Sequence, residues 1–241
     1  CLHLKSFLTF SSIGSTNMES KGLKKLENNQ LDYYQHSSVK NILLKFLVIG
    51  DFGVGKSAIV RRYIEGKYSS NYKVTIGADF STKTFNWAEN TRVSVQLWDI
   101  AGQERFGYMT RVYYKYAVAA ALVFDLTRLG TFHNMLKWLQ DLREKVTLND
   151  GSPIPIIILA TKCDIKEDHV SPDLINRFCK ENSIKAWFTT SAKDDINIDE
   201  AIDYLIEQCI ELSPQVSHRG SLIIDDERTN SWIKRIICCD F

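Results

Sequence analysis

The stretch GDFGVGKSA at residues 50–58 directly follows the apolar run ILLKFLVI at residues 42–49. Its pattern, Gly-x-x-x-x-Gly-Lys-Ser, is typical of a loop that binds phosphate groups between a buried strand and a helix. Glycines let several backbone N–H groups converge on phosphate oxygens, and the N-terminus of the following helix adds a positive dipole end. The stretch therefore predicts a nucleoside triphosphate site at the end of a central strand in an α/β fold.

The residues of this loop have distinct predicted roles. Lys56 is expected to reach the β- and γ-phosphates, and the Ser57 hydroxyl is expected to ligate Mg²⁺, which prefers hard oxygen ligands. A chance glycine-rich turn is the alternative, but the apolar strand before it and the helical pattern after it favour a phosphate site. The predicted phosphate-binding residues are Gly53, Val54, Gly55, Lys56, Ser57 and Ala58.

Two later segments indicate which base is bound. TKCD at residues 161–164 and TSAK at residues 190–193 each follow an apolar run that predicts a buried strand. A carboxylate at Asp164 can accept two hydrogen bonds from guanine, whereas adenine offers no such donor pair. The Ala192 N–H can donate to the guanine carbonyl, and Lys162 can lie along the base. The predicted base site comprises Thr161, Lys162, Asp164, Ser191, Ala192 and Lys193.

Strand-like and helical segments alternate across residues 41–212, which predicts an α/β sheet covered by helices on both faces. Residues 1–39 are polar and predict a disordered arm, and residues 1–17 precede the first methionine and could lie outside the working protein. The domain is expected to end at residue 212, before a disordered tail over residues 213–241. The predicted strands are 41–50, 78–87, 91–99, 118–125, 154–161 and 184–192, and the predicted helices are 56–66, 131–146, 171–182 and 197–212.

Composition narrows the class of protein. The 241 residues carry a net charge of +1, which argues against a general nucleic-acid binder. No apolar run approaches the roughly 18 residues of a spanning helix. The six cysteines have spacings that suggest neither a disulfide framework nor a zinc site. Cys179 and Cys209 fall on apolar helix faces and are expected to be buried as free thiols.

Together these motifs carry a family resemblance. The ordered set GDFGVGKS, TIGADF, WDIAGQERF, VYYK, TKCD and SAK resembles the Ras superfamily of small GTPases over residues 41–212, and the Rab family within it. WDIAGQE with Ile100, TRVYYK and GSPIP are similar to the Rab subgroup of lysosome-related organelles such as melanosomes. The resemblance implies a mostly parallel six-stranded sheet with one antiparallel edge strand, a GTPase activity, and GTP, GDP and Mg²⁺ as ligands.

The resemblance also implies roles for individual residues. Thr75 matches a residue that completes Mg²⁺ coordination and contacts the γ-phosphate, and Asp99 matches one that holds the metal through water. Gly102 matches a γ-phosphate contact, Gln103 matches the residue that orients the attacking water, and Tyr68 matches an aromatic residue beside guanine. The implied catalytic residues are Gln103, Lys56 and Thr75, and the implied metal site comprises Ser57, Thr75 and Asp99.

Residues 68–78 and 102–116 match the two switch segments, which the γ-phosphate orders and hydrolysis releases. The implied effector surface comprises Ile76, Phe80, Trp98 and Tyr113, although the last three could equally be core residues. Implied partners are an exchange factor, a GTPase-activating protein, an escort protein, a GDP-dissociation inhibitor and effectors. No nucleic acid is expected.

The chain ends in CCDF, and this ending resembles the double-cysteine end of Rabs. Cys238 and Cys239 are expected to carry one prenyl group each, and the terminal Phe favours geranylgeranyl. Two unmodified thiols are the alternative. Two lipids hold a protein stably at a membrane, whereas one gives marginal binding. The expected location is the cytoplasmic face of a lysosome-related organelle, endosome or Golgi-derived vesicle, with a cytosolic pool.

Two positions depart from the Rab pattern. Thr161 stands where Rabs usually have Asn, and we expect retained binding with faster nucleotide exchange. Phe52 stands beside the expected γ-phosphate position; it either prolongs the GTP-bound state or is a lid without kinetic effect. These residues keep open a second class, a mostly GTP-bound scaffold with very low turnover. A small-molecule kinase is a third class, but it would leave the TKCD and SAK motifs without a role.

Overall fold

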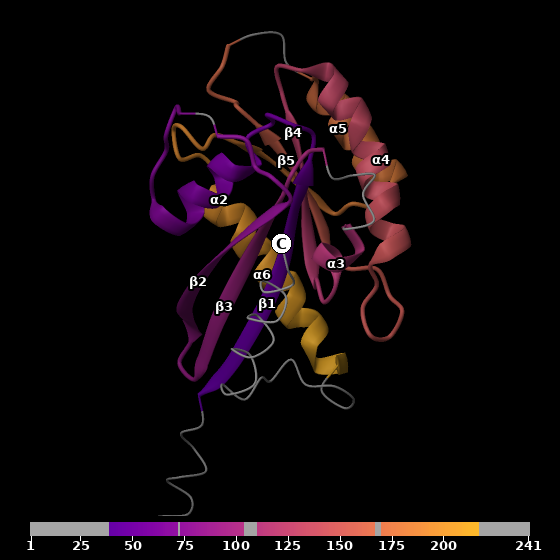
Figure 1. Cartoon of the computed structure of the whole chain (residues 1–241). Helices are drawn as coiled ribbons and strands as arrows, with labels where there is room; N and C mark the ends of the chain where they lie inside the picture. Colours follow the sequence, from indigo (N-terminus) through magenta and orange to yellow (C-terminus); the bar gives the residue numbers. More distant parts are fainter. Residues whose placement is uncertain (1–38, 72, 104–109, 167–169, 217–241) are drawn as a thin grey trace, which may run out of the picture. The chain divides into compact units, whose positions relative to one another are not determined.

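The computed structural model describes residues 39–71, 73–103, 110–166 and 170–216, without the side chains of residues 110 and 213–216. The chain divides into two units, Cys1–Val39 and Lys40–Phe241. The elements of the second unit (Figure 1) are β1 (Lys40–Gly50), α2 (Lys56–Glu65), β2 (Ala78–Ala88), β3 (Thr91–Ile100), α3 (Thr110–Tyr114), β4 (Ala119–Asp125), α4 (Leu129–Lys145), β5 (Ile156–Thr161), α5 (Pro172–Glu181), β6 (Ala186–Thr190) and α6 (Ile198–Val216).

The strands form one sheet in the order β2-β3-β1-β4-β5-β6. β2 pairs antiparallel with β3, and every other pair is parallel, so the predicted six-stranded sheet with one antiparallel edge strand is confirmed. All seven residues of β4 are buried, as expected for a continuous apolar strand in the middle of a parallel sheet.

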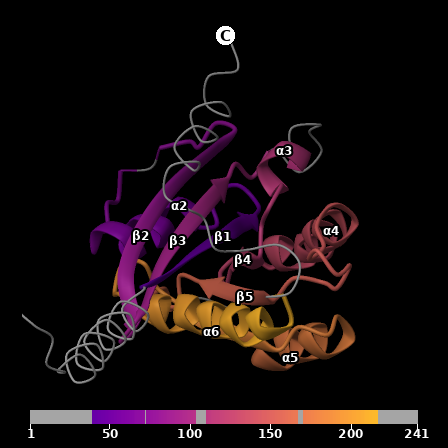
Figure 2. The ribbon, with the colours of Figure 1, turned by 90° about the horizontal axis from the view of Figure 1, so that it is seen from below.

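Two hydrophobic cores lie on opposite faces of this sheet. In β1, Phe46 and Val48 pack into the core beneath α2 and α6, while Leu47 and Ile49 pack into the core beneath α3, α4 and α5. The alternation follows from the two-residue period of a strand. Figure 2 shows α6 and α4 on opposite sides of β5. Helices on both faces are therefore confirmed.

Local sequence signals set the ends of two helices. α2 ends at Gly66, whose φ of 65° is left-handed, and its N–H donates to the Arg62 carbonyl. Ser171 caps α5 by accepting a hydrogen bond from the Leu174 N–H, and Pro172 is the first helical residue.

The end of α6 differs from the prediction. The helix continues to Val216, four residues past the expected boundary at residue 212. The prediction stopped at Leu212, the last apolar residue of the helical pattern, which is exposed. A helix can extend past its packed part because its hydrogen bonds lie within its own backbone. Cys179 and Cys209 are buried free thiols, as predicted. Among the described helices, none combines the length and the apolar character needed to cross a bilayer.

The parallel strands place their carboxyl ends along one edge of the sheet. Gly50 ends β1, Asp99 lies one residue before the end of β3, Asp125 ends β4 and Thr161 ends β5. Open α/β sheets bind their ligands outside this edge, because the loops there converge from several strands.

Candidate functional site

A cavity of about 270 Å³ opens at this edge. It brings the phosphate loop, the TKCD and SAK segments and part of the first expected switch segment to one place. Of the predicted nucleotide-binding residues, Val54 and Ser191 are buried beside the cavity instead of lining it. Gln103 is exposed and does not line it either. The predicted residues that do line it are Gly53, Gly55, Lys56, Ser57, Ala58, Tyr68, Thr75, Gly102, Thr161, Lys162, Asp164, Ala192 and Lys193.

The carbonyl groups of the phosphate loop are all hydrogen-bonded. Lys56 Nζ donates to the carbonyls of Gly50 and Asp51 at 2.8 and 2.9 Å. The next four carbonyls accept from Arg128 Nη2 at 3.2 Å, Lys162 Nζ at 3.1 Å, Thr161 Oγ1 at 2.6 Å and the Ile59 N–H at 3.0 Å. With its acceptors occupied in this way, the loop has its N–H groups left for a phosphate ligand.

Lys56 is buried within this loop. Burial lowers the pKa of Lys56 to about 8, although the carboxylates of Asp99 and Asp51 act to raise it. A phosphate beside the ammonium group would favour its charged form. The lysine is therefore suited to a dianionic ligand.

Three oxygen-bearing side chains converge at the predicted metal site. Ser57 Oγ lies 2.8 Å from Thr75 Oγ1 and also donates to Asp99 Oδ2, and Thr75 Oγ1 donates to the same oxygen at 3.1 Å. Asp99 Oδ1 is buried and has no hydrogen-bond partner among the residues that the structure describes, and burial raises the pKa of this carboxyl group despite the hydrogen bonds to Oδ2. Two hydroxyls and a carboxylate with an unsatisfied oxygen form the hard-oxygen donor set that suits Mg²⁺.

Hydrogen bonds connect the two segments of the predicted base site to each other and to α2. Asp164 Oδ1 accepts a hydrogen bond from Ser191 Oγ at 2.7 Å, so the serine orients the carboxylate from behind. Arg62 of α2 donates to the carbonyls of Ala192 and Lys193 at 2.8 and 3.0 Å. These contacts fix the Asp164 carboxylate and the backbone of Ala192 and Lys193 at the cavity.

Thr161 ties two parts of the site together. Its hydroxyl contacts the Val54 carbonyl in the phosphate loop and, at 2.9 Å, the Phe124 carbonyl in β4. A hydroxyl has one proton, so the two acceptors share a single donor. Thr161 therefore connects β5 to the phosphate loop and to β4 through a single hydroxyl group.

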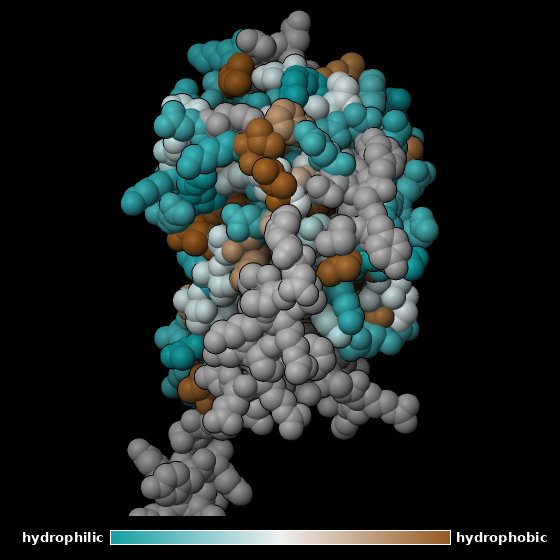
Figure 3. Space-filling view, in the orientation of Figure 1, coloured by the Kyte–Doolittle hydropathy of each residue, from teal (hydrophilic) through white to brown (hydrophobic). Residues whose placement is uncertain are grey.

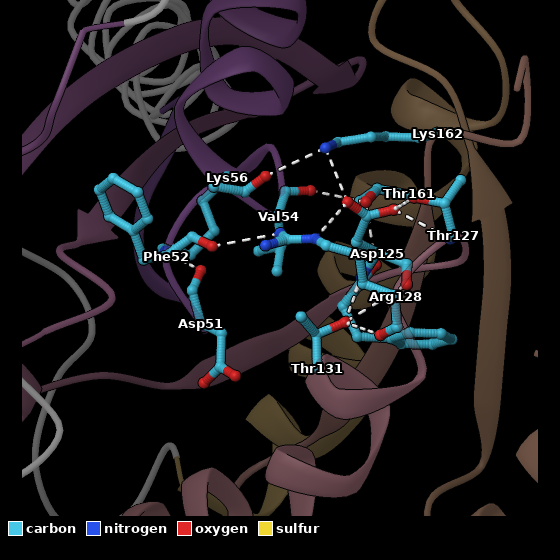
Figure 4. Close-up of polar contacts among 12 residues, drawn as sticks. Asp51, Phe52, Val54, Lys56, Asp125, Thr127, Arg128, Thr131, Thr161 and Lys162 are labelled. Carbon is cyan, nitrogen blue, oxygen red and sulfur yellow. Dashed lines mark hydrogen bonds and ion pairs between the residues drawn. The ribbon is translucent and has the colours of Figure 1, made fainter.

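Phe52 points away from the loop that carries it. The side chain is 43% exposed at the rim of the cavity, and its ring is turned away from Arg128 (Figure 4). Its backbone is tightly covered, because a Cβ atom added to Gly102 would lie 2.2 Å from Phe52 N. Only glycine fits at position 102, and the start of the second expected switch segment thus packs directly on the phosphate loop.

The predicted effector residues differ in exposure: the three aromatic residues are partly buried, and the isoleucine lies on the surface. Phe80 and Trp98 are partly buried and stacked, with ring centroids 5.2 Å apart, and Lys45 Nζ lies 3.6 Å from the centre of the Trp98 ring. Tyr113 is also partly buried, whereas Ile76 is 89% exposed. On the face shown in Figure 3, hydrophobic residues form small patches separated by polar ones.

Comparison with known proteins identifies the family. The Ras family model matches residues 45–211. Human Ras-related protein Rab-32 is 54% identical over 169 residues, which are 70% of this chain and 75% of that protein. Ras-related protein Rab-32B of Dictyostelium discoideum is 50% identical over 177 residues, 73% of this chain and 68% of that protein. Human Ras-related protein Rab-7L1 is 44% identical over 201 residues, which are 82% of this chain and 97% of that protein.

This chain belongs to the Rab family of Ras-type GTPases. It is a small GTPase, which hydrolyses GTP to GDP, and a switch in membrane trafficking. Members of this family bind GTP and GDP, typically with Mg²⁺. When bound, the cation supplies positive charge next to the phosphates, and the residues suited to hold it are Ser57, Thr75 and Asp99.

Several residues that support the site of this Rab GTPase have no role in the sequence prediction. Asp51 accepts hydrogen bonds from Asn134 Nδ2 at 2.7 Å and from Trp138 Nε1 at 2.8 Å, both in α4. Asp125 and Arg128 join the end of β4 to the phosphate loop. The carboxylate at the end of β4 was the available signal, but the contacts that connect it to Lys162 and, through Arg128, to Phe52 join residues that are distant in sequence. The predicted lipidation sites Cys238 and Cys239 lie outside the described residues.

Proposed function

We propose that this Rab GTPase is a membrane-anchored switch that recruits effectors in its GTP-bound form during vesicle trafficking to lysosome-related organelles or endolysosomes. The observation that carries the switch is the convergence of Ser57, Thr75 and Asp99. Thr75 belongs to a segment without regular structure, so a ligand that engages its hydroxyl orders that segment.

The proposed recruiting surface lies next to this segment. Ile76 follows Thr75 directly and is exposed, and the stacked Phe80 and Trp98 lie on the neighbouring strands β2 and β3. An effector that contacts both parts would bind only when the segment is held in place, and would therefore distinguish GTP from GDP. An exchange factor and a GTPase-activating protein would set the balance between the two forms.

The proposed membrane anchor is a pair of prenyl groups on Cys238 and Cys239. The adjacent cysteines near the end of the sequence support this proposal, because two lipids together give stable anchoring. An escort protein would deliver the chain for modification, and a GDP-dissociation inhibitor would maintain its cytosolic pool. An intact mass of the cellular protein without two prenyl groups would refute the anchor.

The proposed compartment rests on sequence similarity. Relatives named Rab-32 and Rab-7L1 share 44–54% of aligned positions with this chain, and Ile100 and the GSPIP segment resemble the subgroup of lysosome-related organelles. Co-localisation of the full-length protein with markers of lysosome-related organelles tests this assignment; exclusive localisation at another organelle would contradict it.

A mostly GTP-bound scaffold is the second candidate, and the position of Phe52 favours it. The exposed ring at the rim of the cavity can restrict access of a GTPase-activating protein to the γ-phosphate. Single-turnover GTP hydrolysis by the full chain, with and without a Rab-type activating protein, separates the candidates. Acceleration by orders of magnitude supports the switch, and tight GTP binding without acceleration supports the scaffold.

The matched variant for this experiment is Phe52→Gly. If Phe52 restrains hydrolysis, the variant hydrolyses GTP faster than the wild-type protein in the presence of the activating protein. Equal rates, alone and with the activating protein, would show that the phenylalanine has no kinetic effect.

A further inference from the structure

We propose that Arg128 is a positioning residue for nucleotide binding, because its guanidinium group joins the Asp125 carboxylate to the Phe52 carbonyl and so fixes the orientation of the phosphate loop. Arg128 precedes α4 and belongs to none of the sequence motifs discussed above. The inference rests on nucleotide binding by this GTPase and is independent of the proposed membrane role.

The contacts of Arg128 span the site from the end of β4 to the phosphate loop (Figure 4). Its Nε donates to Asp125 Oδ2 at 2.9 Å, and its Nη2 donates to the Phe52 carbonyl at 3.2 Å. The guanidinium also lies beside Gly53, where an added Cβ would be 3.7 Å from Nη2. A planar group with several donors in fixed directions can serve both acceptors at once.

Asp125 holds this arginine firmly. Its side chain is buried, and besides Arg128 it binds Lys162 Nζ at 2.7 Å and both the hydroxyl and the N–H of Thr127. Burial alone would raise the pKa of Asp125, but hydrogen bonds, that from Lys162 first, bring it below its ordinary value. The carboxylate is therefore charged at neutral pH and anchors both cations that reach the phosphate loop.

The consequence concerns the direction of one peptide group. Among the carbonyl groups of residues 50–55, only that of Phe52 accepts a hydrogen bond from Arg128. If this carbonyl were released, the following N–H of Gly53 could rotate with it, because both belong to one planar peptide unit. Arg128 thus restrains the Gly53 N–H through the shared peptide group and keeps the Phe52 backbone in place against Gly102, which lines the same cavity as Gly53.

The test is the rate of GDP dissociation from the full-length protein, measured with a fluorescent GDP analogue in the presence of Mg²⁺. Arg128→Ala is expected to release the nucleotide about tenfold faster, the ratio that follows from the loss of one charge-assisted hydrogen bond. The arginine side chain is 44% exposed, so its removal does not open a core. A wild-type dissociation rate in this variant would overturn the proposal.

Arg128→Lys separates positioning from simple charge pairing. An ammonium group can remain paired with Asp125 but lacks the second donor arm that reaches Phe52. We expect this variant to unfold at the wild-type temperature and still to release GDP as fast as Arg128→Ala. Full restoration of the wild-type rate by lysine would overturn the bridging role.

Two controls complete the design. Arg92→Ala, at an exposed arginine of β3, is expected to leave the dissociation rate unchanged. Guanidinium chloride at millimolar, non-denaturing concentration is expected to slow GDP release from Arg128→Ala, whereas equal sodium chloride is not. Failure of guanidinium to slow release relative to sodium chloride would count against a role of the arginine's hydrogen-bonding group.

Discussion

The phosphate loop and the segment over residues 67–77 are neighbours at the same cavity, but they are held in different ways. All carbonyl groups from Gly50 to Gly55 accept hydrogen bonds within the protein. In the second segment no described residue lies in a helix or strand, and Val74 and Ile76 are 53% and 89% exposed. One part of the site is prepared before the nucleotide arrives, and the other depends on contacts at Thr75.

This difference explains how one site can both bind and signal. A fixed cradle contributes affinity for GTP and GDP alike, because it needs no reorganisation on binding. A segment with few contacts can be ordered or released at small energetic cost, and we propose that the γ-phosphate changes its state. The predictions below disturb each part separately.

The largest effect is expected from Lys56→Met, which breaks the fixed part. The variant loses a buried ammonium group and the two hydrogen bonds to the carbonyls of Gly50 and Asp51. Affinity for both GDP and GTP should fall on the order of 10³-fold, because the variant loses the cation expected beside the phosphates as well as the bonds that hold the loop. Calorimetric titration measures both affinities. A loss of less than about tenfold would contradict this account of the cradle.

Thr75→Ala disturbs the conditional part. The hydroxyl that contacts Ser57 and Asp99 disappears, while the phosphate loop is unchanged. Affinity for a non-hydrolysable GTP analogue with Mg²⁺ should fall about tenfold, and affinity for GDP should change little. Thr75→Ser, which keeps the hydroxyl, is the matched control. Equal losses for both nucleotides would show that the segment belongs to the fixed part.

Substitutions of Thr161 test how much one hydrogen bond to the phosphate loop contributes to nucleotide retention. Thr161→Val removes the hydroxyl that reaches the Val54 carbonyl and should speed GDP dissociation several-fold, about the effect of one buried hydrogen bond. Thr161→Asn supplies an additional donor and should slow dissociation. Fluorescent-GDP release measures both variants. Unchanged rates in Thr161→Asn would refute the expectation that threonine gives faster exchange.

The smallest expected effect is the pH dependence of stability that Lys45 contributes. Its ammonium group lies against the ring of Trp98. Burial lowers the pKa of Lys45 to about 8, from an ordinary value near 10.5. Between these values the unfolded chain binds more protons at this residue than the folded protein, so its contribution to the free energy of unfolding increases with pH. Urea unfolding at pH 7.5, 8.5 and 9.5 should show a steeper rise for the wild-type protein than for Lys45→Met. Parallel curves would contradict the assignment.

Much of the fold and the site could be predicted because the signals are local. The phosphate loop, the alternating β3 pattern and the cap at Ser171 each lie within a few consecutive residues, and the structure has a strand, loop or helix end at each of them. Asp125 and Arg128 could not be assigned, because their partners Phe52 and Lys162 lie in other loops. Such contacts arise only when the parallel strands bring their ends together.

Two further differences have physical reasons. The partial burial of Phe80, Trp98 and Tyr113 could not be read from hydrophobicity, since an aromatic residue can pack one ring face and expose the other. The last turn of α6 could not be predicted from an apolar pattern, because backbone hydrogen bonds can extend a helix without one.

Hydrogen exchange measured by mass spectrometry tests the distinction between a fixed and a conditional part most directly. Peptides that cover residues 50–58 and 67–77 are compared in the GDP-bound protein and in the protein bound to a non-hydrolysable GTP analogue, both with Mg²⁺. We predict equal protection of residues 50–58 in the two states and protection of residues 67–77 only with the GTP analogue. Equal exchange of residues 67–77 in both states would contradict the account.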